Sequence, residues 1–280
     1  MELLDGKVVK KEILEDLKKK VESIKEKLSL VVIEVGDDEA SKVYVKQKEK
    51  MALSVGIDFK LLKFPETITN EEILKEIDKL NGDPSVTGML VQMPLPKHLN
   101  AKEIQNRVLP SKDVDGLNDL NAGKLVHNNE GLFPCTAEGI IDILDYYDIA
   151  IKGSFAVVVG RSDLVGKPVA NLLTNRDATV AICHSKTTNL KEITKMADIL
   201  VVAVGKANFI DESYVKDGAV IIDVGINRID DKLVGDVDFE SVKDKVSYIT
   251  PVPGGVGQLT VANLGKNIYK AYTLKKQKAK

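Results

Sequence analysis

Five short runs of apolar residues in the second half of the chain constrain its fold more than any other feature. The runs are SFAVVVG (154–160), ATVAIC (178–183), ADILVVAVG (197–205), AVIIDVG (219–225) and VSYIT (246–250). Strands that are apolar on both faces are typical of a parallel sheet covered by helices on both sides. The pattern therefore predicts an α/β region, in which ligands bind beyond the carboxyl ends of the strands.

The first half of the chain also alternates between helix and strand patterns. Apolar residues spaced by three and four predict a helix over 8–28. Strands are predicted over 28–36, 59–64 and 86–94, and helices over 41–55 and 70–80, the latter with Asn70 as N-cap. The region 95–131 predicts one short helix and long loops, and Thr136 is expected to cap a helix over 136–149. With 280 residues, the chain has room for about two such α/β domains.

Charge and cysteine content exclude several classes of protein. The 40 Lys and Arg against 42 Asp and Glu leave a formal net charge of −2, so no global basic field exists to bind nucleic acid or an anionic membrane. Cys135 and Cys183 lie far apart without a CxxC pair, which argues against a disulfide framework or a cysteine zinc site. No apolar run reaches the ~18 residues of a membrane span, and both charge signs are mixed from the start. We expect a cytoplasmic protein.

The turn GRSDLVGKP (160–168) is a candidate phosphate site. Gly160 follows a predicted strand and Gly166 stands where a helix should begin, an arrangement that suits a phosphate at a helix N-terminus. Ser162 occupies the place of the second glycine of GxGxxG, so a plain strand-to-helix turn remains an alternative.

The end of the next predicted strand favours NADP over NAD. NAD sites usually place an acidic residue there to bind the ribose 2′-hydroxyl, whereas this strand ends in His184, Ser185 and Lys186. Ser185, Lys186 and the nearby Arg161 can donate hydrogen bonds to a 2′-phosphate. A polar loop with chance basic residues is the alternative. Glycines at three further strand ends, in VAVGKAN, DVGIN and TPVPGGVG, favour a ligand site at the same edge.

Candidate catalytic residues lie in the first half. Tyr44 and Lys48 are four residues apart on a predicted helix and share a face, as a proton-transfer pair or as ordinary surface residues. Gln92 ends an apolar strand and needs a polar partner if buried, which a ligand, Lys48 or loop backbone would provide. Asp113 and Asp115 in KDVDG are paired carboxylates, turn formers or, with the least support, metal ligands. We expect no metal site.

Eight stretches of the sequence together resemble the bifunctional methylenetetrahydrofolate dehydrogenase/methenyltetrahydrofolate cyclohydrolase family. They are VGDDEASKVYVKQKEKMALSVGI, GMLVQMPLPKHLN, KDVDGLN, PCTAEGI, VVVGRSDLVGKPVANLL, ATVAICHSKT, DVGIN and TPVPGGVGQLTVANL, in the family's order across nearly the whole chain. The resemblance implies NADP-dependent oxidation of 5,10-methylenetetrahydrofolate to the methenyl cation and its hydrolysis to 10-formyltetrahydrofolate, in one-carbon metabolism and purine biosynthesis. It also implies a homodimer.

The resemblance also implies a domain plan and a set of site residues. It predicts a substrate and catalytic domain over 1–135, a Rossmann-like NADP domain over 136–259, a cleft between them, and a helix over about 260–280 that packs back on the first domain. Lys48 becomes the acid/base or polarising residue held by Gln92, with Tyr44 against the pterin and Asp115 on its amino edge. The cofactor residues implied are Gly160, Arg161, Ser162, Ser185 and Ile226, and Gly254 and Gly255 line the substrate end.

Two residues differ from the family pattern, and three other functions are compatible with the sequence. Ala137 and Gln258 stand where the family usually has proline, so the backbone there is less constrained. The alternatives are a dehydrogenase without cyclohydrolase activity, a non-catalytic NADP-binding sensor, and another two-domain NADP dehydrogenase acting on shikimate-like acids. The KDVDG and VQMPLP motifs argue against the last of these.

Overall fold

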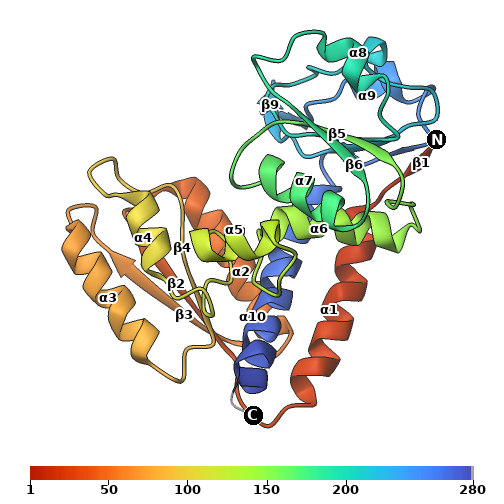
Figure 1. Cartoon of the computed structure of the whole chain (residues 1–280). Helices are drawn as coiled ribbons and strands as arrows, with labels where there is room; N and C mark the ends of the chain where they lie inside the picture. Colours follow the sequence, from red (N-terminus) through yellow and green to blue (C-terminus); the bar gives the residue numbers. More distant parts are fainter. Residues whose placement is uncertain (279–280) are drawn as a thin grey trace. The chain divides into compact units, whose positions relative to one another are not determined.

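The computed structural model describes residues 1–278 and divides them into two compact units. Unit 1 comprises Met1–Lys11 and Thr136–Thr260, and unit 2 comprises Glu12–Cys135 and Val261–Lys280. The predicted C-terminal helix is α10 (Leu259–Lys278), and residues 279–280 of that prediction lie outside the described range. Figure 1 shows the course of the chain.

Unit 1 is built on a parallel sheet. Its strands, all within the described residues, are β1 (Glu2–Leu3), β5 (Phe155–Val159), β6 (Thr179–Cys183), β7 (Ile199–Val202), β8 (Val220–Asp223) and β11 (Tyr248–Ile249). They lie in the order β1-β11-β8-β7-β5-β6, and every neighbouring pair is parallel. The five apolar runs thus form the predicted parallel sheet, and the α/β fold class is confirmed. The sequence did not predict β1.

The strand order of unit 1 marks where a ligand would bind. The chain passes from β5 to β6 at one edge, then returns to β7 on the other side of β5 and continues to β8 and β11. In such doubly wound sheets the ligand crevice lies beyond the carboxyl ends of the two strands where the order reverses. These two strands are β5 and β7.

Helices and a hairpin complete unit 1. The helices are α6 (Cys135–Tyr146), α7 (Gly166–Asn175), α8 (Leu190–Thr194) and α9 (Phe239–Val242), with the 3₁₀ turns η1 (Glu212–Tyr214) and η2 (Val256–Gln258). The hairpin pairs β9 (Asn227–Ile229) with β10 (Lys232–Val234) in antiparallel fashion. Val157 and Val159 belong to the core cluster on one face of the sheet, while Ala156 and Val158 on the other face are equally buried. Both faces are covered, as the apolar runs predict.

Unit 2 holds a smaller parallel sheet, ordered β3-β2-β4. Its strands are β2 (Ser29–Val35), β3 (Asp58–Phe64) and β4 (Gly88–Val91). Its helices are α2 (Glu39–Ser54), α3 (Asn70–Gly82), α4 (Ala101–Arg107) and α5 (Asp119–Val126), with α1 (Gly6–Glu22) from Glu12 onward and α10 from Val261 onward. Leu30 and Val32 of β2 pack in a cluster with side chains of α1, α2 and α10, whereas Val31 and Ile33 pack with α3 and α4. The helices thus cover both faces (Figure 1).

Several predicted boundaries in the first half are wrong. The helix predicted over 8–28 ends at Glu22, because Ile24 and Leu28 join the core cluster from non-helical backbone. Thr69, rather than Asn70, caps α3: its hydroxyl accepts from the Glu72 amide, and the Glu72 carboxylate accepts from the Thr69 amide.

The region 95–131 and the start of α6 also differ from prediction. This region, described throughout, contains two helices, α4 and α5, rather than one. Their N-caps are Asn100 and Asn118, whose side chains accept backbone hydrogen bonds. Thr136 lies inside α6, which begins at Cys135, and its hydroxyl is 3.0 Å from that of Thr260.

Candidate functional site

A lysine and a glutamine that are far apart in the sequence meet at the end of β4. Lys48 Nζ of α2 donates a hydrogen bond to Gln92 Oε1 at 2.8 Å, and Gln92 Nε2 donates to the Met93 carbonyl at 2.7 Å. Gln92 is buried and Lys48 half-buried. Two of the partners considered for Gln92, Lys48 and loop backbone, are therefore both present, and the lysine amine is held in a fixed direction.

The position of Lys48 follows from how α2 begins and which face it buries. The Asp38 side chain caps the helix by accepting from the Ser41 amide at 2.7 Å. One stripe of the helix contains Ser41, Val45, Lys48 and Ala52, because these residues are spaced by four, three and four positions. Ser41, Val45 and Ala52 are buried, so Lys48 belongs to the buried stripe. Tyr44, one turn before Lys48, is 50% exposed.

The KDVDG loop separates the two carboxylates that the sequence could not rank. Asp113 is buried and accepts from the amides of Gly116 at 3.1 Å and Asn118 at 2.8 Å, and from Asn121 Nδ2 at 3.0 Å. Burial raises the pKa of Asp113 to about 6, against the opposing effect of these hydrogen bonds. Asp113 is thus a turn former, and Asp115 stays half-buried on the turn that Asp113 builds. Within residues 1–278, no group of His, Cys, Asp and Glu is arranged to hold a metal ion.

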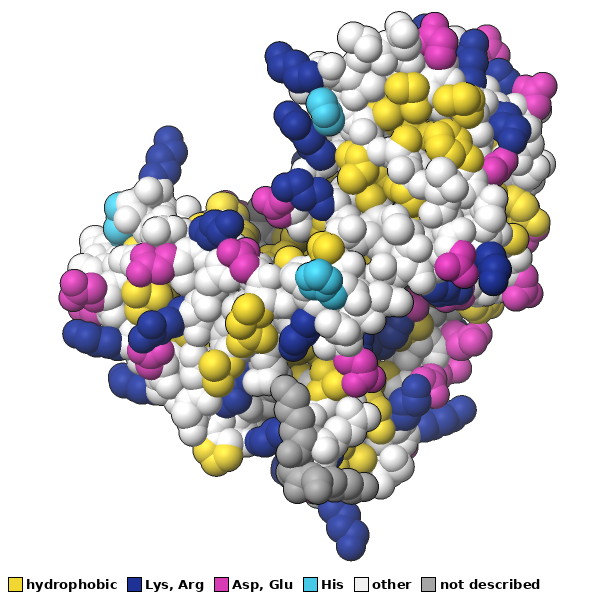
Figure 2. Space-filling view, viewed as in Figure 1, with side chains coloured by type: hydrophobic (Ala, Val, Ile, Leu, Met, Phe, Trp, Pro, Cys, Tyr) yellow, Lys and Arg dark blue, Asp and Glu magenta, His cyan; other side chains and the backbone are white. Residues whose placement is uncertain are grey.

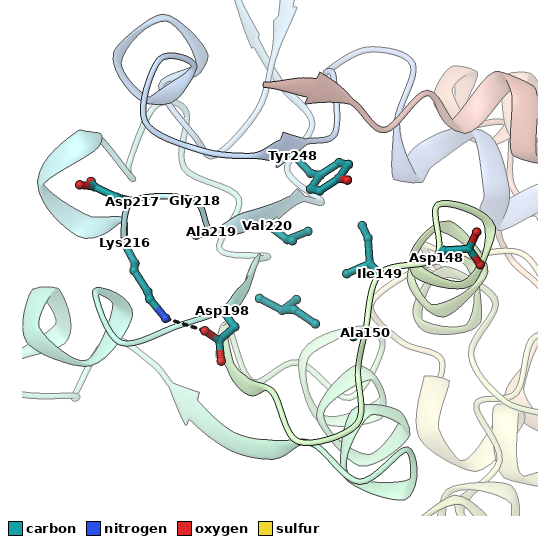
Figure 3. A pocket seen from close by; sticks show the side chains of 11 residues that line it. Asp148, Ile149, Ala150, Asp198, Lys216, Asp217, Gly218, Ala219, Val220 and Tyr248 are labelled. Atoms are coloured by element: carbon teal, nitrogen blue, oxygen red, sulfur yellow. Dashed lines mark hydrogen bonds and ion pairs between the residues drawn. The ribbon is translucent and has the colours of Figure 1, made fainter.

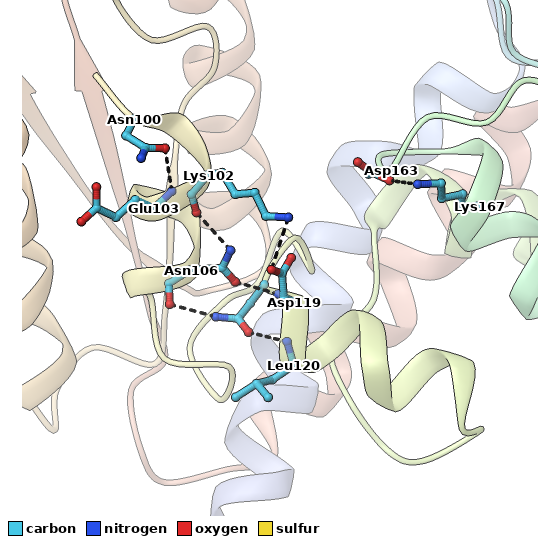
Figure 4. Close-up of polar contacts among 9 residues, drawn as sticks. Asn100, Lys102, Glu103, Asn106, Asp119, Leu120, Asp163 and Lys167 are labelled. Carbon is cyan, nitrogen blue, oxygen red and sulfur yellow. Dashed lines mark hydrogen bonds and ion pairs between the residues drawn. The ribbon is translucent and has the colours of Figure 1, made fainter. Parts of the chain in front are cut away.

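A polar network anchors the far end of this loop. Asn106 Oδ1 accepts from the Asp119 amide at 2.8 Å, and Lys102 Nζ lies 3.4 Å from the Asp119 carboxylate (Figure 4). Asn118 Nδ2 donates to the Val108 carbonyl at 2.9 Å. These contacts connect α5 to α4. They stabilise the loop on the C-terminal side of the turn that carries Asp115.

In unit 1 the turn after β5 has the geometry of a phosphate site. Gly160 has φ +135°, and a Cβ at this position would collide with the carbonyl oxygen of Ala203, which follows β7. Only glycine fits there, at the point where the strand order reverses. Ser162 Oγ accepts from the amides of Val165 at 3.2 Å and Gly166 at 3.3 Å, at the start of α7. The missing second glycine is thus replaced by a hydroxyl at the helix N-terminus. Asp163 and Lys167 form an exposed ion pair on this turn (Figure 4).

The loop after β6 presents Ser185 and Lys186 to solvent. The His184 amide donates to Thr187 Oγ1 at 2.9 Å and the Thr187 amide to the His184 carbonyl at 2.8 Å, which closes a tight turn. Ser185 and Lys186 lie exposed on this turn, as does Arg161 on the first one. No acidic side chain ends β6, so the residues present fit a phosphorylated ribose better than a free 2′-hydroxyl.

Two buried aspartates, which the sequence reasoning missed, organise the loops at the carboxyl ends of β7 and β8. Asp236 accepts from the amides of Val204, Gly205 and Lys206 at 2.6, 2.9 and 2.8 Å, and from Asn227 Nδ2 at 2.9 Å. Asp223 accepts from the amides of Gly225, Asp236 and Val237 at 2.9–3.0 Å. Burial raises the pKa of Asp223 to about 6.

In the sequence, both aspartates have glycines close by. A Cβ on Gly235 would overlap the Asp223 carboxylate, so the backbone can approach that carboxylate only at a glycine. The segments DVGIN and VGDVD, in which these aspartates stand beside apolar residues and single glycines, are compatible with buried carboxylates. The sequence alone does not show that the two carboxylates are buried.

The remaining predicted residues lie at the same edge of unit 1. Ile226 is 55% exposed, and its Cδ1 would be 3.2 Å from a Cβ on Gly257. Gly254 and Gly255 are buried; the Gly254 carbonyl accepts from the Gly6 amide at 2.9 Å, and the Gly255 amide donates to the Pro251 carbonyl at 2.8 Å. The structure therefore brings Ile226 to the glycine-rich segment 254–257.

A separate hollow in unit 1 lies at the opposite edge of the sheet. It is lined by Asp148, Asp198, Lys216 and Tyr248, among others, and includes the Lys216–Asp198 ion pair (Figure 3). Its lining includes the first residues of β7, β8 and β11, Ile199, Val220 and Tyr248. Because ligands of doubly wound sheets bind at the carboxyl ends, this hollow is not the candidate cofactor site.

Comparisons with known proteins match two domains of one family to the chain. Residues 4–115 match the catalytic domain of tetrahydrofolate dehydrogenase/cyclohydrolase, and residues 134–276 match its NAD(P)-binding domain. The chain is 50% identical to the bifunctional protein FolD of Bacillus subtilis over 273 residues, 96% of each chain. It is 53% identical to that of Ligilactobacillus salivarius over 268 residues, 94% of each.

Solved structures give the same answer. The bifunctional FolD enzyme of Campylobacter jejuni superposes with a TM-score of 0.95 at 45% identity, over 98% of this chain and 99% of that one. The Trypanosoma brucei dehydrogenase-cyclohydrolase, solved with NADP cofactor and an inhibitor, gives 0.91 at 34% identity over 98% of each. The glycine turn, the Lys48–Gln92 pair and these matches lead to one conclusion: the chain belongs to the tetrahydrofolate dehydrogenase/cyclohydrolase family.

Proposed function

We propose that the chain is a bifunctional enzyme of one-carbon metabolism. It oxidises 5,10-methylenetetrahydrofolate to the 5,10-methenyl cation with NADP and hydrolyses that cation to 10-formyltetrahydrofolate. The observation that carries the proposal is the Lys48–Gln92 hydrogen bond of 2.8 Å, because hydrolysis needs a positioned proton-transfer group and hydride transfer does not. The relatives of about 50% identity are named bifunctional proteins, which supports both activities in one chain.

The residues of unit 1 bind and orient the cofactor. NADP, when bound, supplies the hydride acceptor. Gly160 and Ser162 admit the pyrophosphate to the N-terminus of α7, and Arg161 and Ser185 donate to the 2′-phosphate. Ile226 lines the path of the ring end, and Gly254 and Gly255 line the substrate end. Holding a flat ring in one orientation is the main requirement of hydride transfer.

Lys48 performs the proton transfer of hydrolysis. A water molecule forms a bond from its oxygen to the carbon between N5 and N10 of the methenyl cation, and its proton passes to the Lys48 amine. The bond from that carbon to N5 then breaks as N5 takes up the proton from the Lys48 ammonium and the hydroxyl on the carbon releases its own proton to solvent water, which leaves the formyl group on N10. Gln92 Oε1 holds Lys48 Nζ in position for both transfers.

Tyr44 and Asp115 orient the pterin. The half-exposed Tyr44 ring lies one helical turn before Lys48 and offers a flat apolar face. The Asp115 carboxylate accepts hydrogen bonds from the amino edge of the pterin, on a turn held rigid by Asp113.

A time-resolved absorbance spectrum tests both activities at once. Purified protein is mixed with 5,10-methylenetetrahydrofolate and NADP, then with NAD, and reduced cofactor and methenyl product are followed together. We expect reduction with NADP and no lasting methenyl build-up beyond the no-enzyme control. Persistent methenyl would indicate a dehydrogenase alone, and no reduction in a folded sample that binds NADP would indicate a sensor.

The role of Lys48 is tested by Lys48→Met. Removing the proton-transfer group should slow methenyl hydrolysis by about 10²-fold or more while NADP binding stays unchanged. Lys46→Met, an exposed lysine on the same helix, is the matched control and should hydrolyse like the wild type. Undiminished hydrolysis in Lys48→Met would exclude this lysine.

The proposed function also assigns roles to the two domains and a cellular location to the enzyme. Residues 1–135 with the C-terminal helix act as the substrate domain and 136–259 as the NADP domain, since the candidate residues divide in this way. We propose a cytoplasmic enzyme that supplies formyl groups for purine biosynthesis. It has no nucleic-acid partner, because the formal net charge is only −2 and the face in Figure 2 carries Lys and Arg together with Asp and Glu. None of the helices within residues 1–278 is both long and apolar enough to cross a membrane.

A homodimer is proposed through the β9–β10 hairpin. This two-stranded sheet has unpaired edges, and Ile229 and Leu233 on it are substantially exposed. Isolated hairpins of this kind are stabilised by pairing with a further strand. Ile229→Lys should lower the molecular mass measured by light scattering from that of a dimer to that of a monomer.

A further inference from the structure

The C-terminal helix α10 reaches the turn that carries Asp115 through one buried side chain. Asn267 is fully buried, and its Nδ2 donates hydrogen bonds to the Val114 carbonyl at 3.0 Å and to the Phe133 carbonyl at 2.9 Å. The Val114 carbonyl belongs to the peptide group that directly precedes Asp115. All four residues lie in unit 2, so a helix at the end of the chain holds this turn directly.

The same turn is packed tightly against the backbone of residues 133–135. Gly116 has φ +76°, and a Cβ at this position would lie 2.2 Å from the carbonyl carbon of Phe133. Cys135 Sγ donates to the Val114 carbonyl at 3.4 Å, so this carbonyl has two donors. Asn267 therefore joins two backbone segments that already lie in close contact, and fixes one peptide group of the turn between them.

Helix α10 also passes close to the helix that carries Lys48. A Cβ on Gly265 would lie 2.9 Å from Met51 Sδ, and Met51 follows Lys48 by three residues on α2. Gly265 and Asn267 are two residues apart, which separates them by about 200° around the axis of α10. One short stretch of α10 thus faces the helix of the proton-transfer group on one side and the turn of Asp115 on the other.

The amide of Asn267 is explained by its two donated bonds rather than by the packing of α10. Its Oδ1 is buried and accepts no hydrogen bond from any described group. A buried oxygen without a donor is unfavourable, and a leucine side chain of similar size would fill the same space without one. The Val114 and Phe133 carbonyls, in contrast, would lose the donor that connects them.

We propose that Asn267 is a positioning residue for the folate substrate, which acts by holding the peptide group that precedes Asp115. A turn that is ordered before the substrate arrives loses less conformational freedom on binding, so its carboxylate binds the amino edge of the pterin more tightly. Because Asn267 is fully buried, it acts through Asp115 and does not contact the substrate itself. This inference rests on the proposed function, which assigns the pterin to Asp115.

The test is the steady-state dehydrogenase reaction, in which KM for 5,10-methylenetetrahydrofolate and KM for NADP are measured separately. Asn267→Leu nearly keeps the volume of the side chain and removes both donors, so the folate KM should rise by about tenfold. A contact made equally in the ground state and the transition state affects KM alone, so kcat should change by less than about threefold. KM for NADP should stay within about twofold of the wild type, because the candidate cofactor residues belong to unit 1.

Ile268→Val is the matched control for a loss of stability. Ile268 is the next residue of α10 and is equally buried, but it packs in the apolar core cluster of unit 2. Removing one methyl group should lower Tm and leave the folate KM within about twofold of the wild type. An equal rise of the folate KM in Ile268→Val and Asn267→Leu would reflect a general loosening of α10 and would overturn the inference.

A double-mutant cycle with Asp115→Ala separates this inference from the proposed function. Asp115→Ala should raise the folate KM at least as much as Asn267→Leu, and adding Asn267→Leu to it should change KM by less than about twofold. An unchanged folate KM in Asp115→Ala refutes the proposed role of Asp115. A raised KM in Asp115→Ala beside an unchanged KM in folded Asn267→Leu refutes the role of Asn267 alone, as do two effects that multiply in the double variant.

Asn267→Gln covers the case in which Asn267→Leu does not fold. Glutamine keeps the amide but displaces it by one methylene group, so the two bonds to the turn cannot both keep their geometry. The folate KM should again rise while KM for NADP does not. A folate KM equal to that of the wild type overturns the inference.

Discussion

Replacing Asp236 by asparagine should weaken unit 1 severely, although it changes only one atom of the side chain. Each carboxylate oxygen of Asp236 accepts two hydrogen bonds, Oδ2 from the amides of Val204 and Gly205 and Oδ1 from Lys206 and Asn227. An asparagine keeps one oxygen and turns an NH₂ group toward two N–H donors. Two of the four bonds are then lost, and their donors are left without an acceptor.

The magnitude follows from these bonds. A hydrogen bond to a charged acceptor contributes about 1.5–3 kcal/mol, so two lost bonds cost about 3–6 kcal/mol. Relief from burying a charge offsets part of this, which leaves a decrease of about 3 kcal/mol in the free energy of unfolding. For a chain of 280 residues that corresponds to a fall in Tm of roughly 5 °C.

Urea titration and thermal melting of purified protein measure this loss. Asp238→Asn is the control: Asp238 caps α9 by accepting from the Ser241 amide, and asparagine caps a helix nearly as well. Its Tm should stay within about 2 °C of the wild type, because a change of a few tenths of a kcal/mol in the free energy of unfolding shifts Tm by no more than this. If Asp236→Asn melted together with Asp238→Asn, the four hydrogen bonds would not have the energetic weight assigned to them.

Three further predictions concern the cofactor turn, a helix cap and pH. Gly160→Ala should raise the Kd for NADPH, measured by fluorescence titration, by tenfold or more, because φ +135° and the Ala203 carbonyl exclude a Cβ; unchanged binding would disprove the close approach. Thr69→Ala should lower the free energy of unfolding by about 1 kcal/mol and Thr69→Ser by much less, and equal losses would mean that the hydroxyl is not the cap. Burial raises the pKa of Asp113 to about 6, so the folded chain holds a proton that the unfolded chain has lost above about pH 4. The stability of the wild type relative to Asp113→Asn should therefore fall by up to about 3 kcal/mol as the pH rises from about 4 to 6 and stay level above, whereas a constant difference would contradict the raised pKa.

The main strands could be predicted because their apolar composition indicates that both of their faces are buried. Residues 155–159 and 199–202 are apolar without interruption, and no other arrangement buries both faces so simply. The two-residue strand β1 could not be predicted, because Glu2 and Leu3 adopt it only by pairing with β11. Asn70 and Thr69 are both good caps, and Glu72, three residues after Thr69, decides between them.

The site was less accessible to sequence reasoning than the fold. Periodicity placed Lys48 and Tyr44 on one helix, but could not show that Lys48 belongs to the buried stripe and reaches Gln92, 44 residues further along the chain. The two aspartates of KDVDG look alike in sequence, and only hydrogen bonds to three donors assign Asp113 to the turn. Buried carboxylates such as Asp223 depend on long-range burial, which local patterns do not record.

The strand β1 has a consequence for how the chain folds during synthesis. Glu2 and Leu3 are synthesised long before their partners Tyr248 and Ile249, which follow 246 residues further along the chain. Unit 2 is completed in the same way by α10, whose Val261, Leu264 and Ile268 fill the core beside α1 and β2. Neither unit can close before these late segments have been made, so the nascent chain carries an open sheet edge and an uncovered apolar face while the residues between them are synthesised. A chain truncated before residue 248 should therefore aggregate or engage chaperones rather than accumulate as a folded fragment.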